Sequence, residues 1–272
     1  MKKGLNGWTL PRNMPLAEAA SAVRTAGFDT FEPGLESEGE LSVTTDEPSV
    51  RAIGEQIRAT GLQISSLALG LTNLTPYTSP DPAVRQQAMD ITLAGLDRAN
   101  WIGAKVLLVV PGRIIDRTDP HRPIVGYSDA LSYAYDALSE LTFEAEARGV
   151  TIGIENTWGQ FLLSPVEMRD FVDRINSPWL GVYFDTGNVL KYGFPQDWID
   201  TLAGRICGIH IKDFKLDVGT KQGFCALGDG DVDWPEVIAA LKHNGYSGPL
   251  TCEGPGDLTE ISQRVDKILV YN

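Results

Sequence analysis

The stretch TIGIEN at Thr151–Asn156 decides the fold, because an apolar strand there ends in a carboxylate, Glu155. Three later stretches repeat this arrangement with another side chain that can bind a metal. LGVYFD ends at Asp185, ICGIHIKD contains His210, and PLTCEG contains Glu253. Four successive strand-like segments therefore each place one ligand for a hard cation near the carboxyl end of the strand. We expect the remainder of the chain to bring these four ends together.

Side chains alternate between the two faces of a strand, so the direction of each ligand can be predicted. Glu155 shares its face with Gly153, whereas Ile152 and Ile154 point the other way. The other three strands follow the same rule, with bulky apolar residues opposite the ionisable group. The apolar faces must pack against helices, which predicts that all four ionisable groups point into the mouth of one barrel.

Short apolar strands alternate with amphipathic helices along the whole sequence. The predicted strands are Lys3–Thr9, Phe28–Gly34, Leu62–Leu69, Ala104–Val110, Val150–Glu155, Leu180–Asp185, Arg205–Lys212 and Leu250–Glu253. The predicted helices are Leu16–Ala26, Ser49–Thr60, Ala83–Ile102, Asp129–Arg148, Pro165–Ile175, Gln196–Leu202, Trp234–His243 and Leu258–Val270. Eight of each in 272 residues predicts an α/β protein with a single (β/α)8 TIM barrel over residues 1–272. The alternative is a doubly wound open sheet, and the lack of a G-x-G-x-x-G motif after the first strand argues against it.

Glycines mark the points where helices stop just before strands. They are Gly27, Gly61, Gly103, Gly149 and Gly245. A residue directly after a helix often adopts a left-handed backbone conformation, which glycine tolerates best. The positions of these glycines support the repeated strand–helix pattern of the barrel.

Composition excludes several classes of partner. The formal net charge is −13, which argues against duplex nucleic acid, because phosphate contacts need clustered Lys and Arg. The three cysteines match no zinc pattern and indicate buried thiols rather than disulfides. The sequence has no signal-peptide pattern and no apolar run of about 18 residues, so we expect a soluble cytoplasmic protein without a membrane partner.

Each of the four ligand residues, taken alone, could be an ordinary polar residue at a strand end. All four together favour a metal site, because three crowded carboxylates repel one another and raise their pKa values unless a cation is present. Three carboxylates and one imidazole suit Mn²⁺, Mg²⁺ or Co²⁺ better than a thiolate-bound Zn²⁺.

Further polar and aromatic side chains are predicted at the same rim, where they would line a site for a sugar-sized ligand. These candidate substrate-binding residues are Trp8, Glu32, Asn156, Trp158, Asn188 and Lys212. Trp8 and Trp158 could equally belong to the core, and Lys212 could pair with a carboxylate. Asp213 is expected to support His210 or Lys212. The Gly-rich segment Lys221–Asp231 could form a lid or ordinary turns.

The ordered motifs resemble the sugar phosphate isomerase/epimerase family, which has the xylose isomerase-like barrel. They are IEN at Glu155, FDTGN at Asp185, IHIKD at His210, LGDGDVDW at Leu227–Trp234 and CEG at Glu253, and the resemblance covers nearly the whole chain. It implies that Glu155, Asp185, His210 and Glu253 bind one divalent metal ion. Mn²⁺ is the expected ion, with Mg²⁺, Co²⁺ or Zn²⁺ as alternatives.

Within this family the motifs are most similar to those of ketose and ketose-phosphate 3-epimerases, such as the L-xylulose 5-phosphate type. The resemblance implies that Glu155 and Glu253 are the catalytic acid/base pair. One would remove the proton at C3 and the other would return it, through a metal-stabilised enediolate. The expected partner is therefore a small sugar or sugar phosphate. Barrels of this family often pair, so a homo-oligomer is also expected.

Two departures bear on the substrate. Asn188 stands where free-ketose 3-epimerases typically carry histidine, and Phe214–Leu216 stands where they carry an arginine. These positions favour the sugar-phosphate branch, for which Arg113, Arg117 and Lys221 are the candidate phosphate contacts.

Other activities use the same architecture. The alternatives are a 1,2-isomerase, a metal-dependent dehydratase or lyase acting on an inosose-like keto-polyol, and a non-catalytic sugar-binding barrel. A nuclease of this architecture would need more than the three histidines of this chain, and a basic surface.

Overall fold

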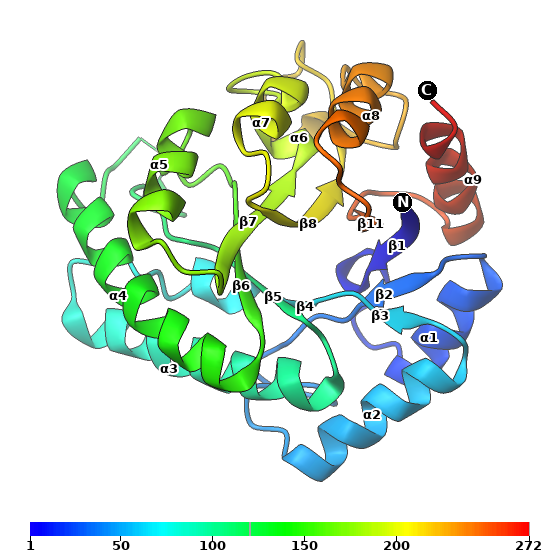
Figure 1. The fold of residues 1–272 in the computed structure, drawn as a ribbon, viewed down its shortest axis with the longest axis horizontal. Coiled ribbons are helices and arrows are strands. Elements are labelled where there is room, and N and C mark those ends of the chain that lie inside the picture. Colours follow the sequence, from blue (N-terminus) through cyan, green and yellow to red (C-terminus); the bar gives the residue numbers. More distant parts are fainter. Residues whose placement is uncertain (120, 272) are drawn as a thin grey trace.

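Parallel strands pair side by side around a nearly closed ring in the computed structural model, which describes residues 1–119 and 121–271 (Figure 1). The hydrogen-bonded order is β3-β2-β1-β11-β8-β7-β6-β5-β4. β3 and β4 are separated only by Ser65 and Ser66 and therefore form one interrupted strand of the barrel. This strand pairs with β2 through β3 and with β5 through β4, which closes the ring. The predicted α/β TIM barrel is therefore confirmed.

The barrel strands are β1 (Lys2–Asn6), β2 (Thr30–Glu32), β3 (Gln63–Ile64), β4 (Leu67–Leu69), β5 (Val106–Val109), β6 (Thr151–Glu155), β7 (Leu180–Asp185), β8 (Ile206–Ile211) and β11 (Pro249–Cys252). The helices are α1 (Leu16–Thr25), α2 (Glu47–Ala59), α3 (Pro82–Ile102), α4 (Tyr127–Arg148), α5 (Pro165–Ile175), α6 (Thr186–Val189), α7 (Pro195–Thr201), α8 (Trp234–His243) and α9 (Leu258–Leu269). Apart from the four-residue α6, the helices lie around the outside of the ring and cover the apolar faces of the strands (Figure 1). A two-stranded hairpin, β9 (Asp213–Phe214) with β10 (Phe224–Cys225), follows β8.

Several elements differ from the sequence-based expectation. The predicted first strand Lys3–Thr9 ends at Asn6, because Gly7–Thr9 forms a 3-10 helix, and the predicted loop after β8 contains the hairpin β9/β10. The predicted third strand is interrupted at Ser65 and Ser66, because the Ser66 hydroxyl turns inward to contact Glu32 and the Tyr183 hydroxyl. The short helix α6 was not predicted, and the side chain of Asp185 caps its start by accepting a hydrogen bond from the Asn188 amide at 2.8 Å.

The five glycines that precede strands all have a left-handed backbone, with φ between 62° and 91°. Gly103 and Gly149 are the cap residues of α3 and α4, and in this conformation the backbone N–H of each donates to carbonyl groups in the last turn of its helix. The prediction of their role in ending helices is confirmed.

The register between strands sets the height of the predicted ligands. Asp185 of β7 is the direct partner of His210 of β8, and Thr251 of β11 pairs with His210 from the other side. Glu155 of β6 is the partner of Tyr183, two residues before Asp185. Since the strands are parallel, their carboxyl ends all meet at one mouth of the barrel. The first strand pairs with the last, β1 with β11.

Tyr183 fills the barrel interior below this mouth and is 1% exposed. Glycines on both neighbouring strands make room for its ring. A Cβ atom on Gly208 would lie 2.4 Å from Cε2 of Tyr183, and one on Gly153 would lie 3.1 Å from its Cδ2. Gly208 and Gly153 therefore have no Cβ atom at the two places where the Tyr183 ring must fit.

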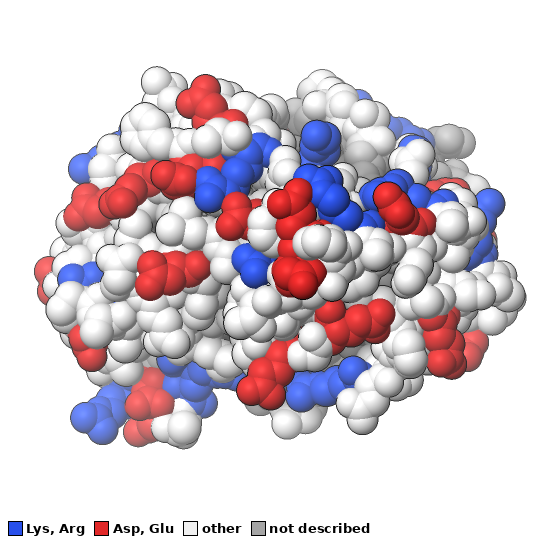
Figure 2. All heavy atoms as spheres, turned by 90° about the horizontal axis from the view of Figure 1, so that it is seen from below, with Lys and Arg blue, Asp and Glu red and all other residues white. Residues whose placement is uncertain are grey.

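Acidic and basic side chains are interspersed over the face of the molecule shown in Figure 2. Cys207, Cys225 and Cys252 are free thiols, as predicted, although only Cys252 is fully buried. Among the residues that the structure describes, no helix has the length and apolar character needed to span a membrane.

Replacing Gly208 by alanine should lower the free energy of unfolding by about 1–3 kcal/mol, because the added methyl group overlaps the Tyr183 ring. Gly254→Ala is the matched control, since its Cβ would meet only Cys252 Sγ, at 3.6 Å. Urea titration of the three proteins measures the difference. Equal stability of the two variants would show that the interior is not tightly packed at Tyr183.

Candidate metal centre

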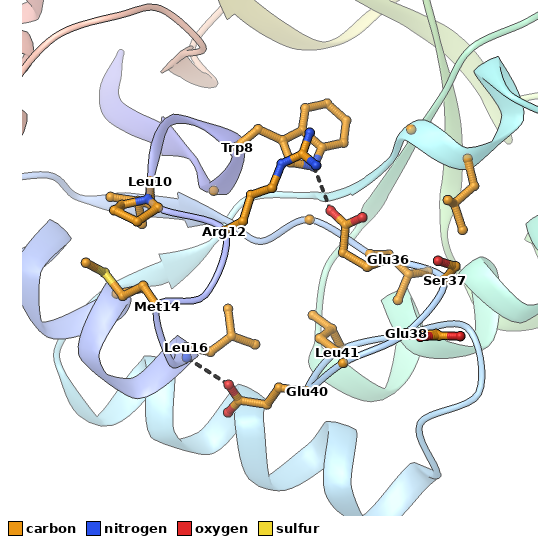
Figure 3. Close-up of a pocket in the computed structure, with 18 of the residues that line it drawn as sticks. Trp8, Leu10, Arg12, Met14, Leu16, Glu36, Ser37, Glu38, Glu40 and Leu41 are labelled. Carbon is orange, nitrogen blue, oxygen red and sulfur yellow. Dashed lines mark hydrogen bonds between the residues drawn. The ribbon is translucent and has the colours of Figure 1, made fainter.

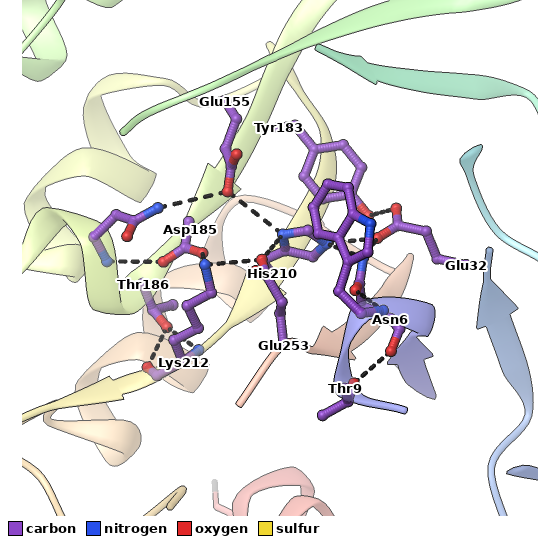
Figure 4. Close-up of polar contacts among 12 residues, drawn as sticks. Asn6, Thr9, Glu32, Glu155, Tyr183, Asp185, Thr186, His210, Lys212 and Glu253 are labelled. Atoms are coloured by element: carbon purple, nitrogen blue, oxygen red, sulfur yellow. Dashed lines mark hydrogen bonds and ion pairs between the residues drawn. The ribbon is translucent and has the colours of Figure 1, made fainter. Parts of the chain in front are cut away.

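Four side chains from four neighbouring strands of the sheet meet at the barrel mouth (Figure 4). They are Glu155 at the end of β6, Asp185 at the end of β7, His210 in β8 and Glu253 directly after β11. Each offers one ligand atom, and these atoms all lie within 4.8 Å of one another. The convergence that the alternation of side chains predicts is present in the structure.

The donor atoms suit a divalent cation. Asp185 Oδ2, His210 Nδ1 and Glu253 Oε2 are buried and have no well-oriented hydrogen-bond partner among the described residues. Their contacts are ion-pair approaches to Lys212 and to one another at 2.8–3.0 Å. Several buried atoms that are aimed at one point without well-oriented hydrogen bonds indicate a ligand. Three carboxylate oxygens and one imidazole nitrogen would satisfy a hard or borderline cation such as Mn²⁺ or Mg²⁺. The residues therefore fit such an ion.

Burial disfavours the ionised form of the carboxylates in this cluster. It raises the pKa of Glu155 and of Asp185, and the neighbouring Glu253 raises both further. Lys212 acts in the opposite direction and favours the ionised carboxylates. Two of the three acids are thus harder to ionise than they would be in water, and a bound cation would remove this penalty.

Lys212 supplies positive charge at the edge of the cluster. Its Nζ lies 3.0 Å from Asp185 Oδ2 and 2.8 Å from Glu253 Oε2. Although burial opposes ionisation, Lys212 and then His210 hold the pKa of Glu253 at about 2. Of the two roles left open for Lys212, pairing with carboxylates is the one seen here.

Glu32 contacts the imidazole of His210 at Nε2, the ring nitrogen that points away from the other ligand residues. The Nε2 atom lies 2.5 Å from Glu32 Oε1, and both side chains are completely buried. A hydrogen on Nε2 is donated to this carboxylate, which leaves Nδ1 facing the cluster, 2.9 Å from Glu253 Oε2. Burial disfavours the charged ring, yet Glu32 and Glu253 together raise the pKa of His210 well above its usual value. A metal ion and a proton therefore compete for Nδ1.

Three further side chains fix Glu32. Asn6 Nδ2 donates to Oε1 at 2.6 Å, Tyr183 Oη donates to Oε2 at 2.5 Å, and Ser66 also donates to Oε2. Both Glu32 oxygens are engaged, so its position argues for support of His210 rather than for the predicted contact with substrate. Sequence reasoning missed Asn6, Ser66 and Tyr183. The one signal was that Tyr183 shares the interior face of its strand with Asp185.

Asn156 and Asn188 hold the ends of β6 and β7 together. The Asn156 side chain donates to the Asp185 carbonyl at 2.9 Å and accepts from the Asp185 amide at 2.8 Å. Asn188 Nδ2 donates to the Asn156 carbonyl at 3.0 Å and lies 3.5 Å from Glu155 Oε1. Asn156 is therefore placed to position Asp185, whereas Asn188 reaches the edge of the cluster itself.

Aromatic side chains stand at two sides of the mouth. Trp158 is half-buried, donates from Nε1 to the Asn188 carbonyl at 2.9 Å, and packs against Phe214 and Phe224 at 5.2 Å between ring centroids. Trp8 lies on the other side and is 36% exposed. Neither side chain is fully buried, and a role for them as walls of a ligand site stays a prediction.

Asp213 does not support His210 or Lys212, and that expectation is wrong. Its carboxylate accepts hydrogen bonds from the Gly228 amide at 2.7 Å, the Val232 amide at 3.2 Å and Trp234 Nε1 at 3.0 Å. It therefore organises the Gly-rich loop between β10 and α8. The sequence LGDGDVDW supplies these donors, and a Cβ atom on Gly230 would lie 2.2 Å from Asp213 Oδ1, so glycine is needed there.

Comparisons with known proteins agree with this geometry. The model of the family described as "Xylose isomerase-like TIM barrel" matches residues 20–268. A putative L-ribulose-5-phosphate 3-epimerase, SgbU, of Haemophilus influenzae is 26% identical over 93% of this chain and 88% of its own length. The L-ribulose-5-phosphate 3-epimerase UlaE of Salmonella paratyphi C is 25% identical over 92% of this chain and 86% of its own.

Solved structures show the same fold. The D-psicose 3-epimerase of Clostridium cellulolyticum H10, determined with D-tagatose, superposes with a TM-score of 0.81. The match covers 100% of this chain and 99% of that one at 17% sequence identity.

Asp185→Asn should weaken Mn²⁺ binding by more than about a hundredfold, because it removes a ligand while its amide oxygen can still cap α6. The unchanged chain should gain about 2.7 kcal/mol of stability at an Mn²⁺ concentration of about 100 times Kd, and a chelator should reverse this gain. Electron paramagnetic resonance of free Mn²⁺ and thermal unfolding measure both effects. Asp136→Asn on the outer surface of α4 is the control, and equal affinity in the two variants would contradict the site.

Glu32→Gln should weaken Mn²⁺ binding by about 10–100-fold, since the amide no longer fixes the ring orientation of His210. Ser66→Ala, which removes one of the donors to Glu32, should have a smaller effect in the same direction. The same resonance titration gives both dissociation constants, and circular dichroism checks that the fold is kept. An unchanged constant in Glu32→Gln would show that Glu32 does not position the ligand.

Proposed function

The chain belongs to the xylose isomerase-like TIM barrel family, and from this premise we propose that it is an isomerase. We infer a divalent-metal-dependent epimerase that inverts C3 of a ketose or ketose phosphate. The observation that carries this proposal is the convergence of Glu155, Asp185, His210 and Glu253 within 4.8 Å. Relatives named as L-ribulose-5-phosphate 3-epimerases, which span nearly the whole chain, support it.

The placement of the two glutamates suits inversion. In the ring the order is β11, β8, β7, β6, so Glu253 and Glu155 are the outer members of the ligand set, and Asp185 and His210 lie between them. A substrate carbon held over the centre would therefore meet one carboxylate on each side. Inversion at a carbon needs a base on one face and an acid on the other.

A divalent cation bound by these four residues would polarise the substrate carbonyl and stabilise the negative charge that develops on it. One glutamate, as carboxylate, takes the proton from C3, and the electron pair of the broken C–H bond moves toward the C2 carbonyl. The other glutamate, in its acid form, delivers a proton to the opposite face of C3. The two acids have then exchanged protonation states, so the reverse reaction uses the same residues.

Residues of the rim bind and orient the sugar in this proposal. Lys212 and Asn188 offer hydrogen-bond donors beside Glu253 and Glu155, and Trp158 and Trp8 provide the walls. Glu32 and Asn156 act through His210 and Asp185 instead. A cytoplasmic location and a homo-oligomeric state stay predictions from the sequence.

Incubation of the Mn²⁺-loaded enzyme in D₂O with a panel of ketoses and ketose phosphates tests the reaction. We expect deuterium at C3 together with inverted C3 configuration, both measured by NMR, because the returned proton comes from an acid that exchanges with solvent. Loss of a hydroxyl group would instead indicate the dehydratase alternative. Binding of a sugar without deuterium incorporation at C3 would indicate a non-catalytic sugar-binding barrel and would contradict the proposal.

Glu155→Gln and Glu253→Gln should each lower kcat by about 10²–10⁴-fold, the usual range for loss of general acid–base catalysis. Since both residues are also ligands, turnover is compared at saturating Mn²⁺, with the bound metal quantified in each variant. Glu236→Gln in the first turn of α8 is the control. Full turnover in either variant with metal bound would rule out its role in proton transfer.

A further inference from the structure

A cavity of about 630 Å³ lies between the segments that follow β1, β2 and β4, and Trp8 forms part of its wall (Figure 3). Trp8 and Arg12 come from the first of these segments, Glu36 and Glu40 from the second, and Leu74 from the third. Of the residues given a role in the proposed function, only Trp8 lines this space.

Strands β1 and β2 each carry a residue that contacts His210 and then continue into the wall of the cavity. β1 supplies Asn6, whose Nδ2 lies 3.5 Å from His210 Nε2, and two residues later it leads into the cavity wall at Trp8. The Trp8 amide donates to Asn6 Oδ1 at 2.7 Å. β2 ends at Glu32 behind His210 and continues to Glu36, which accepts from Trp8 Nε1 at 3.2 Å. The wall of the cavity is thus anchored on the same residues that support His210, and a substrate long enough to reach from the cluster past Trp8 would enter it.

The cavity is larger than one sugar requires. At about 30 Å³ for each molecule, 630 Å³ is space for about twenty waters. A pentose has only half that number of non-hydrogen atoms, and part of it would already lie at the metal centre. The space corresponds to a second group of similar size, attached to the end of the ketose chain.

The lining suits hydroxyl groups. Trp8 offers an aromatic wall, and Leu74 is one of several apolar residues beside it. The lining also contains Glu36, Glu38 and Glu40, whose carboxylates can accept hydrogen bonds, and Arg12 and Arg117, whose guanidinium groups can donate them. A hydroxyl both donates and accepts, so it can pair with either kind of group.

The same lining opposes a phosphate. Three carboxylates face two guanidinium groups, and a phosphate dianion accepts hydrogen bonds without donating any. Of the three candidate phosphate contacts in the sequence, only Arg117 is among the lining residues. Arg113 instead donates to the Ile115 carbonyl at 2.9 Å.

We propose that this cavity binds a second, uncharged sugar unit, so that the preferred substrate is a ketose with a glycosyl group at its far end. This inference rests on the proposed epimerase function and narrows its substrate class.

Three probes that share one reacting end and differ only at O6 test the inference: D-fructose, its 6-O-glucoside isomaltulose, and D-fructose 6-phosphate. We expect kcat/KM for deuterium incorporation at C3 to be about tenfold or more higher for isomaltulose than for the other two. Preference for the phosphate, or equal rates for fructose and isomaltulose, would overturn the inference and leave the epimerase function standing. Exchange in none of the three would also overturn it, and the wider panel of ketoses then decides the function separately.

A variant that narrows the cavity checks where the preference arises. Leu74 lines the cavity and is 55% exposed, so Leu74→Trp should fold normally and reduce the isomaltulose-to-fructose ratio of kcat/KM about tenfold. Val166→Trp on α5, where valine is 48% exposed, is the control and should leave the ratio unchanged. An unchanged ratio in Leu74→Trp would place the glucosyl group elsewhere and overturn the inference.

Discussion

Three carboxylates forced into one buried place are the constraint on which the rest of this molecule depends. Burial and mutual repulsion both disfavour ionised Glu155 and Asp185. The surrounding structure offsets that cost without removing it. Lys212 contributes a positive charge on one side, and Glu32 fixes the imidazole of His210 on the other. This leaves a set of donor atoms that can be fully satisfied by a cation, which is the state suited to chemistry at a sugar carbonyl.

The barrel divides these tasks between its two halves. β6, β7, β8 and β11 carry the four ligands, whereas β1 and β2 carry the support for His210 and then continue into the cavity wall. Asn6 and Glu32 connect the two halves. Both contact His210, Asn6 also accepts a hydrogen bond from the Trp8 amide, and Glu32 precedes Glu36 by four residues. The recognition of a substrate's far end is thus built on the same strands that hold the metal ligand in place.

Much of the fold could be predicted from the sequence, because period-two alternation and the glycines after helices are local signals. The four ligands could also be predicted, since each ends an apolar strand and one register error would turn it away from the mouth. Roles that depend on contacts across the barrel could not. Glu32 looks like any rim carboxylate until Ser66 and Tyr183 are seen to meet it. Asp213 follows the ligand strand directly, yet its partners lie up to 21 residues later, at Trp234.

The pairing of β1 with β11 joins the two ends of the described chain, with nearly the whole sequence between them. Chains are made from the amino terminus, so a ribosome must release the segment carrying β11 before the ring can close. Until then β1 presents an unpaired edge, which chaperones or other nascent chains can contact. Glu253 emerges with that same segment, so ring closure and completion of the cation site are one late event in biosynthesis.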